Sequence, residues 1–385
     1  MSPQIEEIVL QEFGRRYGGP PEHLVRAPGR VNLIGEHTDY NDGFVLPLAI
    51  DRATWIALRP RADGRVQLFS IDQQETVEFD PNDLRKGAVS WMEYPKGVAW
   101  ALRDAGYQLY GWEGVSICDV PMGAGLSSSA SFELATARAF AAVSHFQWDA
   151  KRIALLCQRA ENDWVGVKCG VMDQMISAIG REGHAILIDC RDLATEAVPL
   201  PLHTAVVVLD TTTRRGLVES AYNERRRQCE TAAKFFGVKA LRDLTLERLK
   251  EGARGLDAVV FQRARHVVTE NERTLKAAAV MRSGDAVSLG QLLDESHVSL
   301  RDDFAVSNAE LDQIVAIAQS MPGCLGARMT GAGFGGCAIA LVEGKATESF
   351  LREAGRQYRK ATGLSAKLYV CRAVDGAEEV ISRQG

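Results

Sequence analysis

The sequence predicts an α+β fold in two domains. Its 385 residues exceed what one typical hydrophobic core accommodates. Strand-like apolar runs and helical patterns also follow one another in irregular order, whereas a doubly wound parallel sheet would alternate them regularly. Near the middle of the chain, a short connection with two prolines, LATEAVPLPLH, interrupts this series. We therefore predict a domain boundary within 192–204, which divides the chain into residues 1–195 and 196–385.

The strands are predicted from short runs of apolar, often β-branched residues between turn-forming segments. In chain order, these runs cover residues 53–59, 65–71, 115–120, 185–190, 205–210, 337–342 and 366–371.

Helices are predicted from apolar residues at helical spacing. In 149–164, Asp149 is suited to be the N-cap, and an i, i+3, i+4, i+7 stripe begins at Ile153. A second helical region, 218–236, is rich in Arg and Glu and follows the run at 205–210. Residues 1–18 also carry apolar side chains at helical spacing, but they lack the apolar core of a signal peptide.

The composition excludes several classes of partner. A net charge of -5 and a pI near 5.9 give no support for binding nucleic acid or an anionic membrane. No apolar run approaches the length of a membrane span. The eight cysteines are scattered without a CxxC pair, so neither a zinc site nor a disulfide framework is expected. Reduced thiols of a cytoplasmic protein are the prediction.

The segment RAPGRVNLIGEHTDYNDGF, residues 26–44, gathers many polar groups around an apolar run. These groups are Arg30, Asn32, Glu36, His37, Asp39, Tyr40, Asn41 and Asp42. Unpaired charges inside a core would cost several kcal/mol each, so we predict a turn at a core edge that presents them to a small polar ligand. A metal site at Glu36, His37 and Asp39 is disfavoured, because three side chains so close in sequence do not easily converge on one ion.

The segment VPMGAGLSSSASFELATARAF, residues 120–140, reads as a strand, a glycine-rich turn, three serines and an Ala-rich helix. Glycines let backbone N–H groups approach a ligand closely, and a helix N-terminus adds unpaired donors and a positive dipole end. The hydroxyls of Ser127 to Ser129 could bind phosphate or Mg²⁺. Helix capping would need one serine, so we favour anion binding. The chain contains no GxxxxGK[ST] motif, which excludes a Walker loop.

A second glycine-rich loop, MTGAGFGGCAIALV at 329–342, contains GxGxxG at Gly331, Gly333 and Gly336. A dinucleotide site requires this pattern to open a helix, but here it runs into a strand. The loop therefore either closes over phosphates or packs closely at a hairpin, and both alternatives stay open.

The candidate acid–base group is Asp173, in KCGVMDQMISAIG at 168–180. An Asp in a first helical turn is often explained by the helix dipole alone. Here it occurs together with Arg30, a phosphate-binding loop and Glu161. Phosphoryl transfer needs a held triphosphate, Mg²⁺, a group that orients or deprotonates the acceptor hydroxyl, and a cation for the developing charge.

Three motifs resemble those of one kinase family. PGRVNLIGEHTDYNDG is similar to the galactokinase signature, VPMGAGLSSSAS to the ATP loop of the GHMP small-molecule kinases, and MTGAGFGGCAIALV to their third motif. Further agreement is found in WMEYPKGV, AENDWVGVKCGVMDQMIS, DCR, SAYNERRRQCE and SHVSLRDDF, in family order along essentially the whole chain. The first motif resembles galactokinases in particular, rather than homoserine, mevalonate or phosphomevalonate kinases.

The resemblance implies an N-terminal α/β domain with a mixed sheet and a C-terminal ferredoxin-like α+β domain, with the active site in the cleft between them. It implies phosphorylation of the anomeric (C1) hydroxyl of D-galactose by ATP, with Mg²⁺ as cofactor, in a cytoplasmic enzyme expected to act as a monomer. Two rivals stay open. They are an N-acetylgalactosamine 1-kinase and a non-catalytic, galactokinase-like sugar sensor. The sensor would lack residues after the loop serines, but Ser129-Ala130-Ser131 is intact here.

The resemblance also implies roles for residues. Glu36, His37 and Asp39 would hydrogen-bond sugar hydroxyls, together with Tyr222 and the backbone near Gly170. Asp173 would act as base, and Arg30 would stabilise the alkoxide and the transferring phosphoryl group. Ser129 and Glu161 would hold Mg²⁺, Trp91 and Tyr94 would form the adenine pocket, and the phosphate loop would comprise Gly123, Ala124, Gly125, Leu126, Ser127, Ser128 and Ser129. Relatives often have Gly at the position of Ala124, so the loop should not need a positive φ there.

Overall fold

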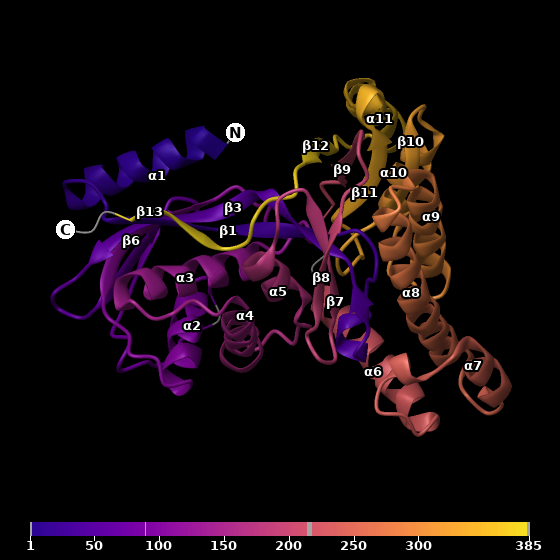
Figure 1. Cartoon of the computed structure of the whole chain (residues 1–385), viewed down its shortest axis with the longest axis horizontal. Coiled ribbons are helices and arrows are strands. Elements are labelled where there is room, and N and C mark those ends of the chain that lie inside the picture. The colour runs from indigo at the N-terminus through magenta and orange to yellow at the C-terminus, as the bar shows by residue number, and fades with distance from the viewer. Residues whose placement is uncertain (1, 89, 214–217, 383–385) are drawn as a thin grey trace.

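The computed structural model describes residues 2–88, 90–213 and 218–382, which form two halves that lie side by side (Figure 1). Within these residues, the strands are β1 His23–Asn32, β2 Phe44–Val45, β3 Pro47–Pro60, β4 Val66–Ser70, β5 Glu75–Phe79, β6 Trp112–Cys118, β7 His184–Asp189, β8 Thr195–Pro199, β9 Thr204–Asp210, β10 Cys324–Met329, β11 Cys337–Glu343, β12 Lys367–Cys371 and β13 Glu378–Ser382. The helices are α1 Ser2–Tyr17, α2 Glu93–Asp104, α3 Ser128–Ser144, α4 Ala150–Arg159, α5 Met172–Ile179, α6 Val218–Phe235, α7 Leu246–Gly252, α8 Ala258–Arg282, α9 Ala286–Asp302, α10 Ala309–Ser320 and α11 Thr347–Thr362. Short 3₁₀ turns cover Asp39–Asn41, Leu241–Asp243 and Gly344–Ala346, and a π-helical turn covers Ala160–Val165.

The N-terminal half is built on a mixed sheet with the order β13-β1-β3-β6-β4-β5, in which β4 and β6 are parallel and the other pairs antiparallel. Side chains of a strand point alternately to the two faces of a sheet. Along β3, Trp55 therefore packs with Val9 and Phe13 of α1, whereas Ile56 and Leu58 join the core formed with the helices on the opposite face. In Figure 1, α1 lies on one side of this sheet and α2 to α5 lie on the other.

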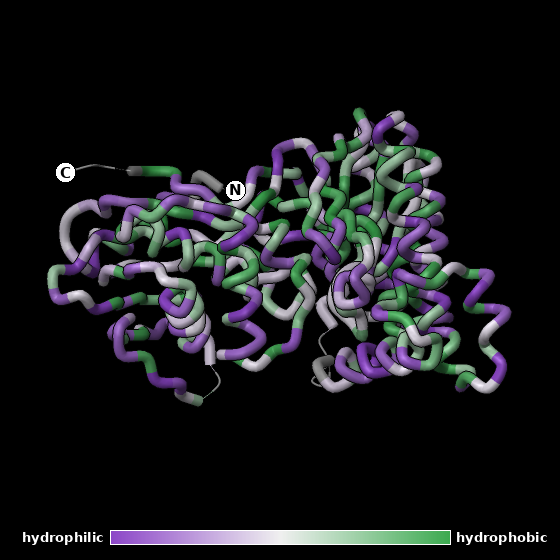
Figure 2. Tube along the Cα trace, turned by 60° about the horizontal axis from the view of Figure 1, so that its bottom comes forward, coloured by the Kyte–Doolittle hydropathy of each residue, from purple (hydrophilic) through white to green (hydrophobic). Residues whose placement is uncertain are grey.

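The C-terminal half is built on an antiparallel sheet with the order β10-β11-β9-β12. Taken in chain order, β9, a helical segment, the β10–β11 hairpin, α11 and β12 make a β-α-β-β-α-β unit, the ferredoxin-like arrangement. Green and purple stretches alternate along the helices in Figure 2, as expected for helices that bury one face. Both predicted sheet architectures are confirmed.

A hydrophobic core joins the two halves. It combines Leu33, within the first motif, and Leu46, just after it, with Leu126 of the first glycine-rich loop and Val208 and Ile339 of the second sheet. A small sheet of β2, β7 and β8 adds to this junction. The loops that carry the sequence motifs therefore start from packed structure on both sides.

The secondary-structure predictions agree closely with the observed elements. Each predicted strand overlaps an observed one, and the Asp149 carboxylate caps α4 by accepting a hydrogen bond from Arg152 N at 3.1 Å. The helix predicted at 149–164 ends earlier, at Arg159, and continues as the π-helical turn. In α1, Val9 and Phe13 are buried but Ile8 is exposed. In the part of the chain that the structure describes, every helix is too short or too polar to cross a membrane.

We keep the domain division at 195/196 as a proposal. The chain passes from the small sheet to the second large sheet between β8 and β9, inside the predicted boundary segment. The last strand, β13, returns to pair with β1 of the first sheet. Residues 378–382 therefore belong structurally to the N-terminal half, a long-range pairing that no local pattern indicates.

Candidate active site

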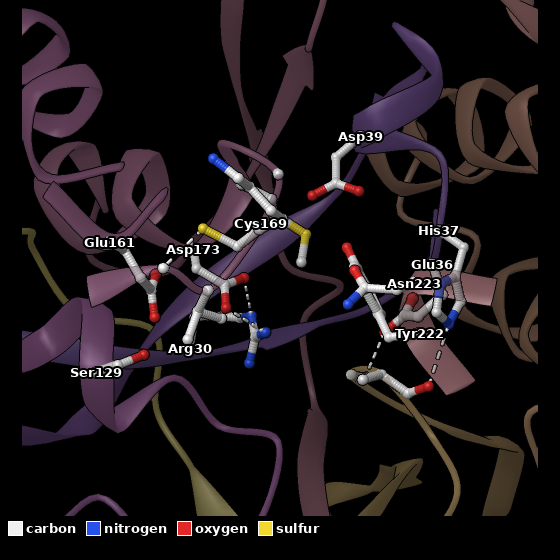
Figure 3. A pocket seen from close by; sticks show the side chains of 17 residues that line it. Arg30, Glu36, His37, Asp39, Ser129, Glu161, Cys169, Asp173, Tyr222 and Asn223 are labelled. Atoms are coloured by element: carbon white, nitrogen blue, oxygen red, sulfur yellow. Dashed lines mark hydrogen bonds and ion pairs between the residues drawn. The ribbon is translucent and has the colours of Figure 1, made fainter. Parts of the chain in front are cut away.

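A cavity of about 250 Å³ lies where the two halves meet (Figure 3). Its walls come from β1, the turn after it, the π-helical turn, α5, α6 and the β10–β11 loop. The lining residues are Arg30, Glu36, His37, Asp39, Ser129, Glu161, Gly166, Val167, Lys168, Cys169, Gly170, Met172, Asp173, Tyr222, Asn223, Gly331 and Ala332. The cavity thus brings together every residue predicted for catalysis, sugar binding and the metal.

The first motif folds into a turn that the rest of the chain holds tightly. Glu36 is buried, and its Oε1 accepts hydrogen bonds from Gly331 N at 2.9 Å and from the Thr330 hydroxyl at 3.0 Å. Its Oε2 accepts a hydrogen bond from Asn32 Nδ2 at 2.7 Å and forms an ion pair with Arg328 Nη2 at 2.7 Å. Both carboxylate oxygens thus have protein partners. Glu36 anchors the turn to the C-terminal half, and its contact with a sugar stays a prediction.

His37 is also engaged by the protein. Its Nε2 lies 3.2 Å from the Ala332 carbonyl oxygen, and its Nδ1 lies 2.9 Å from the Tyr40 hydroxyl. Because a carbonyl only accepts, Nε2 carries the hydrogen and Nδ1 accepts from Tyr40. Burial and, as the second cause, the neighbouring His266 lower the pKa of His37 to about 3. His37 is therefore neutral at physiological pH, and a sugar hydroxyl that bonded its ring would have to replace one of these partners.

Asp39 extends into the cavity beside Gly170. A β-carbon at residue 170 would lie 1.7 Å from Asp39 Oδ2, so only glycine leaves room for this carboxylate. Burial and, as the second cause, the negative charge of Asp173 raise the pKa of Asp39 to about 6. The ring of Tyr222, from α6, packs against His37 and Tyr40 with centroids 5.6 and 5.4 Å apart. This side of the cavity combines an acceptor, a neutral ring and an aromatic wall, which suits a polyhydroxylated ligand.

Arg30 and Asp173 form a two-point ion pair in the centre of the cavity. Arg30 Nε donates to Asp173 Oδ1 at 2.8 Å, and Arg30 Nη2 donates to Oδ2 at 2.7 Å. Arg30 Nη1 donates to the Gly125 carbonyl oxygen at 2.6 Å, so the same guanidinium also holds the first glycine-rich loop. An arginine placed between a carboxylate and a phosphate loop can stabilise negative charge that develops between them.

Glu161 lies next to Ser129, on the opposite side of Asp173 from Asp39 and His37 (Figure 3). It belongs to the π-helical turn, a local irregularity that is often found at functional sites. Its carboxylate accepts hydrogen bonds from the Ser129 side chain and from Gln174 Nε2, the latter at 2.7 Å, and lies 3.1 Å from Cys169 Sγ. Burial raises the pKa of Glu161.

Ser129 and Glu161 form a donor set that suits Mg²⁺. This ion is commonly bound through one or two protein oxygens together with substrate phosphates and water. Among the described residues, no group of three or more His, Cys, Asp and Glu side chains could hold a metal by itself. A metal here would therefore depend on the phosphates of a bound nucleotide.

The first glycine-rich loop begins after β6 and leads into α3. Gly123, Gly125 and Ser127 have positive φ, whereas Ala124 does not, as expected from the sequence. A β-carbon at Gly331 would lie 2.9 Å from the Gly125 carbonyl oxygen, and one at Gly336 would lie 2.9 Å from that of Ala124. The second glycine-rich loop, at the β10–β11 hairpin, thus packs backbone to backbone on the first. This agrees with the close-packing alternative.

A second cavity, of about 170 Å³, adjoins the first and shares Ser129 with it. It contains both aromatic residues predicted for the adenine pocket, Trp91 and Tyr94, together with Phe132, Met122 and Ser128, among others. Trp91 is held in place by a hydrogen bond from its Nε1 to Glu75 Oε2 at 2.9 Å. Aromatic walls of this kind suit a flat heterocycle.

Several residues of the site were missed by the sequence reasoning. Asn223 lines the first cavity directly after Tyr222, and Cys169 borders Gly170. Glu133 and Gln174 are buried behind Glu161, with Gln174 Nε2 3.0 Å from Glu133 Oε2. Burial raises the pKa of Glu133 well above its ordinary value, with the Glu161 charge as the second cause. A Glu inside an Ala-rich apolar helix was the available signal for Glu133, but nothing in the sequence indicated Gln174.

Comparisons with known proteins agree with this geometry. The galactokinase galactose-binding signature matches residues 11–60, the GHMP kinase N-terminal domain matches 93–181 and the GHMP kinase C-terminal domain matches 275–360. The chain is 48% identical over 376 residues to the galactokinase of Roseiflexus sp. strain RS-1, with 96% of each chain covered. It is 46% identical over 382 residues to the galactokinase of Chloroflexus aggregans, with 98% of each covered.

Solved structures also match this chain. The crystal structure of Lactococcus lactis galactokinase complexed with galactose matches with a TM-score of 0.94 and 36% identity, covering 97% of this chain and 99% of that one. A mevalonate kinase structure matches with a TM-score of 0.65 at 18% identity, covering 91% of this chain and 99% of that one, which shows a shared fold alone.

Proposed function

This chain belongs to the galactokinase family of the GHMP kinases, and we therefore propose that it transfers the γ-phosphoryl group of ATP to the anomeric (C1) hydroxyl of D-galactose. The products are galactose 1-phosphate and ADP. One observation carries the proposal. The Arg30–Asp173 pair stands in one cavity between the Asp39 turn on one side and the Ser129–Glu161 pair on the other. Sugar, base and phosphate groups would thus meet within a single cavity.

The proposed reaction is an in-line displacement in which this chain mainly positions the reactants. Asp173 accepts the proton of the C1 hydroxyl as the sugar oxygen forms its bond to the γ-phosphorus. The bond between that phosphorus and the oxygen bridging to the β-phosphate breaks, and ADP leaves with the electron pair. Arg30 stabilises negative charge on the sugar oxygen and the transferring group, because its guanidinium already spans the base and the phosphate loop.

Galactose would lie against Asp39, with Tyr222 and the backbone at Gly170 completing its surroundings. Asp39 provides an acceptor that occupies the space left by the absent side chain at Gly170. Glu36 and His37 are proposed to contact sugar hydroxyls at the far wall, where their existing protein partners hold them in one orientation. Such a site discriminates between epimers, because a misplaced hydroxyl leaves buried polar groups unpaired.

ATP would lie across the two cavities. Its adenine would occupy the pocket of Trp91 and Tyr94, and its phosphates the N–H groups of the loop from Gly123 to Ser129. Ser129 and Glu161 would hold Mg²⁺ together with the phosphates. When bound there, Mg²⁺ neutralises phosphate charge and polarises the transferring group.

We infer further that the protein acts in the cytoplasm, where ATP is available, and that it acts as a monomer. Among the described residues, none of the eight cysteines forms a disulfide, as suits a reducing compartment. Size-exclusion chromatography with light scattering, with and without substrates, tests the monomer.

A coupled assay of ADP release across a panel of sugars tests the function. We expect galactose to be phosphorylated at least about a hundredfold faster than glucose, because one lost hydrogen bond to a charged group costs about 1.5–3 kcal/mol and the unpaired partner adds to this. A preference for N-acetylgalactosamine would show that this sugar is the substrate, and the proposed phosphoryl transfer would be unchanged. Binding of ATP and galactose without any ADP release would identify a sensor instead of an enzyme.

A further inference from the structure

Ser127 has an unusual conformation and an unexpected partner. It precedes α3 in the N-cap position, but its side chain makes no capping hydrogen bond. Its backbone is left-handed, with φ at +60°, which is uncommon for a residue other than glycine. Instead of capping the helix, its hydroxyl donates to Asp173 Oδ2. Helix capping therefore does not explain this serine.

The acceptor sites on Asp173 are almost filled. Each carboxylate oxygen offers two lone pairs. Oδ2 receives hydrogen bonds from Arg30 Nη2 and from Ser127, whereas Oδ1 receives one, from Arg30 Nε. Counting donors from the described residues alone, one acceptor position stays available, on Oδ1. The carboxylate is fixed in orientation by three donors that come from β1 and from the phosphate loop.

We propose that Ser127 is a positioning residue for Asp173, which fills Oδ2 together with Arg30 and leaves Oδ1 as the oxygen that receives the proton of the sugar hydroxyl. This inference rests on the proposed function, in which Asp173 is the base. It assigns to the first serine of the loop a partner other than ATP. It also assigns the proton to one named oxygen.

The same contacts link the base to the phosphate loop. Arg30 Nη1 donates to the Gly125 carbonyl oxygen at 2.6 Å, and the Arg30 backbone N–H donates to the Leu126 carbonyl oxygen at 3.0 Å. With the Ser127 hydroxyl, three contacts thus join this loop to the pair of Arg30 and Asp173. When this loop binds the phosphates of ATP, these contacts would hold the base in a fixed position relative to the γ-phosphorus.

The test variant is Ser127→Gly, which removes the hydroxyl and suits the left-handed backbone. We expect kcat to fall about tenfold or more, and the KM for ATP to change less than about twofold. In an Asp173→Ala background, the same substitution should cause no further loss, because no base remains to be positioned. The matched control is His145→Gly, at the opposite end of α3 with φ at +52°, which should change neither constant.

A rise in the KM for ATP with kcat unchanged would make Ser127 a phosphate ligand and overturn the proposal. So would an additive loss in the Asp173→Ala background. A second double-mutant cycle measures stability and does not depend on enzyme activity. The unfolding equilibrium constants of the wild type, both single variants and the double variant should show a coupling of about fivefold or more between residues 127 and 173. Absence of this coupling would refute the contact itself. Coupling without galactose phosphorylation by the wild type would instead refute the proposed function.

Discussion

Gly170 and Asp39 lie so close together that one added carbon atom would displace the carboxylate. A β-carbon at residue 170 would be 1.7 Å from Asp39 Oδ2, 2.3 Å from its Cγ and 2.9 Å from its Oδ1. The two residues are far apart in the sequence. Asp39 lies in the turn after β1, and Gly170 lies just before α5. The position of the Asp39 carboxylate therefore depends on a glycine far away in the sequence.

Gly170→Ala should disrupt sugar use and leave nucleotide binding nearly intact. The added methyl group must move Asp39 or the backbone before α5, so we expect kcat/KM for galactose to fall at least about tenfold. The KM for ATP should stay within about twofold, because the nucleotide loop is separate. Steady-state kinetics with each substrate varied provides the measurement, and Gly14→Ala on α1, where the added carbon makes ordinary contact, is the control. Unchanged galactose kinetics would show that Asp39 is free to shift.

Asp173→Asn should abolish proton acceptance with little change in shape. An amide keeps the size of the carboxylate but cannot take up the proton of the C1 hydroxyl, so we expect turnover to fall about a hundredfold or more. Isothermal titration should still detect binding of ATP and galactose, and circular dichroism should show a folded protein. Near-normal turnover would remove Asp173 as the base.

Asp39→Asn should stabilise the protein without ligands at neutral and alkaline pH. The pKa of Asp39 is raised to about 6 by burial and by the charge of Asp173, above its ordinary value of 3.8. Folding thus favours the protonated form of Asp39. The contribution of protonated Asp39 to the stability of the folded protein is fully present below about pH 4 and is lost as pH rises through 6. At pH 8 the wild type carries a desolvated charge, whereas Asn carries none.

Thermal unfolding between pH 4.5 and 8 measures this effect. We expect the Tm of Asp39→Asn to exceed that of the wild type by about 2 °C or more at pH 8, with the difference shrinking toward pH 4.5. Asp63→Asn, at an exposed carboxylate with a lowered pKa, should not gain stability at pH 8 and serves as the control. A difference between Asp39→Asn and wild type that did not depend on pH would show that the Asp39 pKa is not raised.

Glu161→Gln should increase the Mg²⁺ concentration needed for half-maximal activity. The substitution removes the negative charge next to Ser129 but keeps a side chain of the same length. Binding of galactose without nucleotide should be unchanged, because Asp39 and Tyr222 lie on the other side of Asp173. A Mg²⁺ titration and a separate galactose titration test both statements. An unaltered Mg²⁺ requirement would exclude Glu161 as a metal ligand.

The sequence by itself determined the local structure and the chemical character of the site. Short apolar runs located the strands, Asp149 marked the start of α4, and the glycines and serines after β6 indicated an anion-binding loop that leads into a helix. These features depend on neighbours within a few residues, so they can be read from periodicity and turn chemistry. The motifs then indicated the family and the roles proposed for Arg30 and Asp173.

The tertiary structure alone decided which groups are already engaged. Glu36 has the charge of a ligand-binding residue, but Arg328 of β10 and Thr330 just after it occupy its oxygens. Ser127 has the position of a helix cap, but its hydroxyl bonds Asp173. Such contacts join segments far apart in the chain, and they depend on how the two halves pack. Periodicity and spacing describe only the near neighbours of a residue, so the partner of a buried polar group becomes known only once the chain has folded around it.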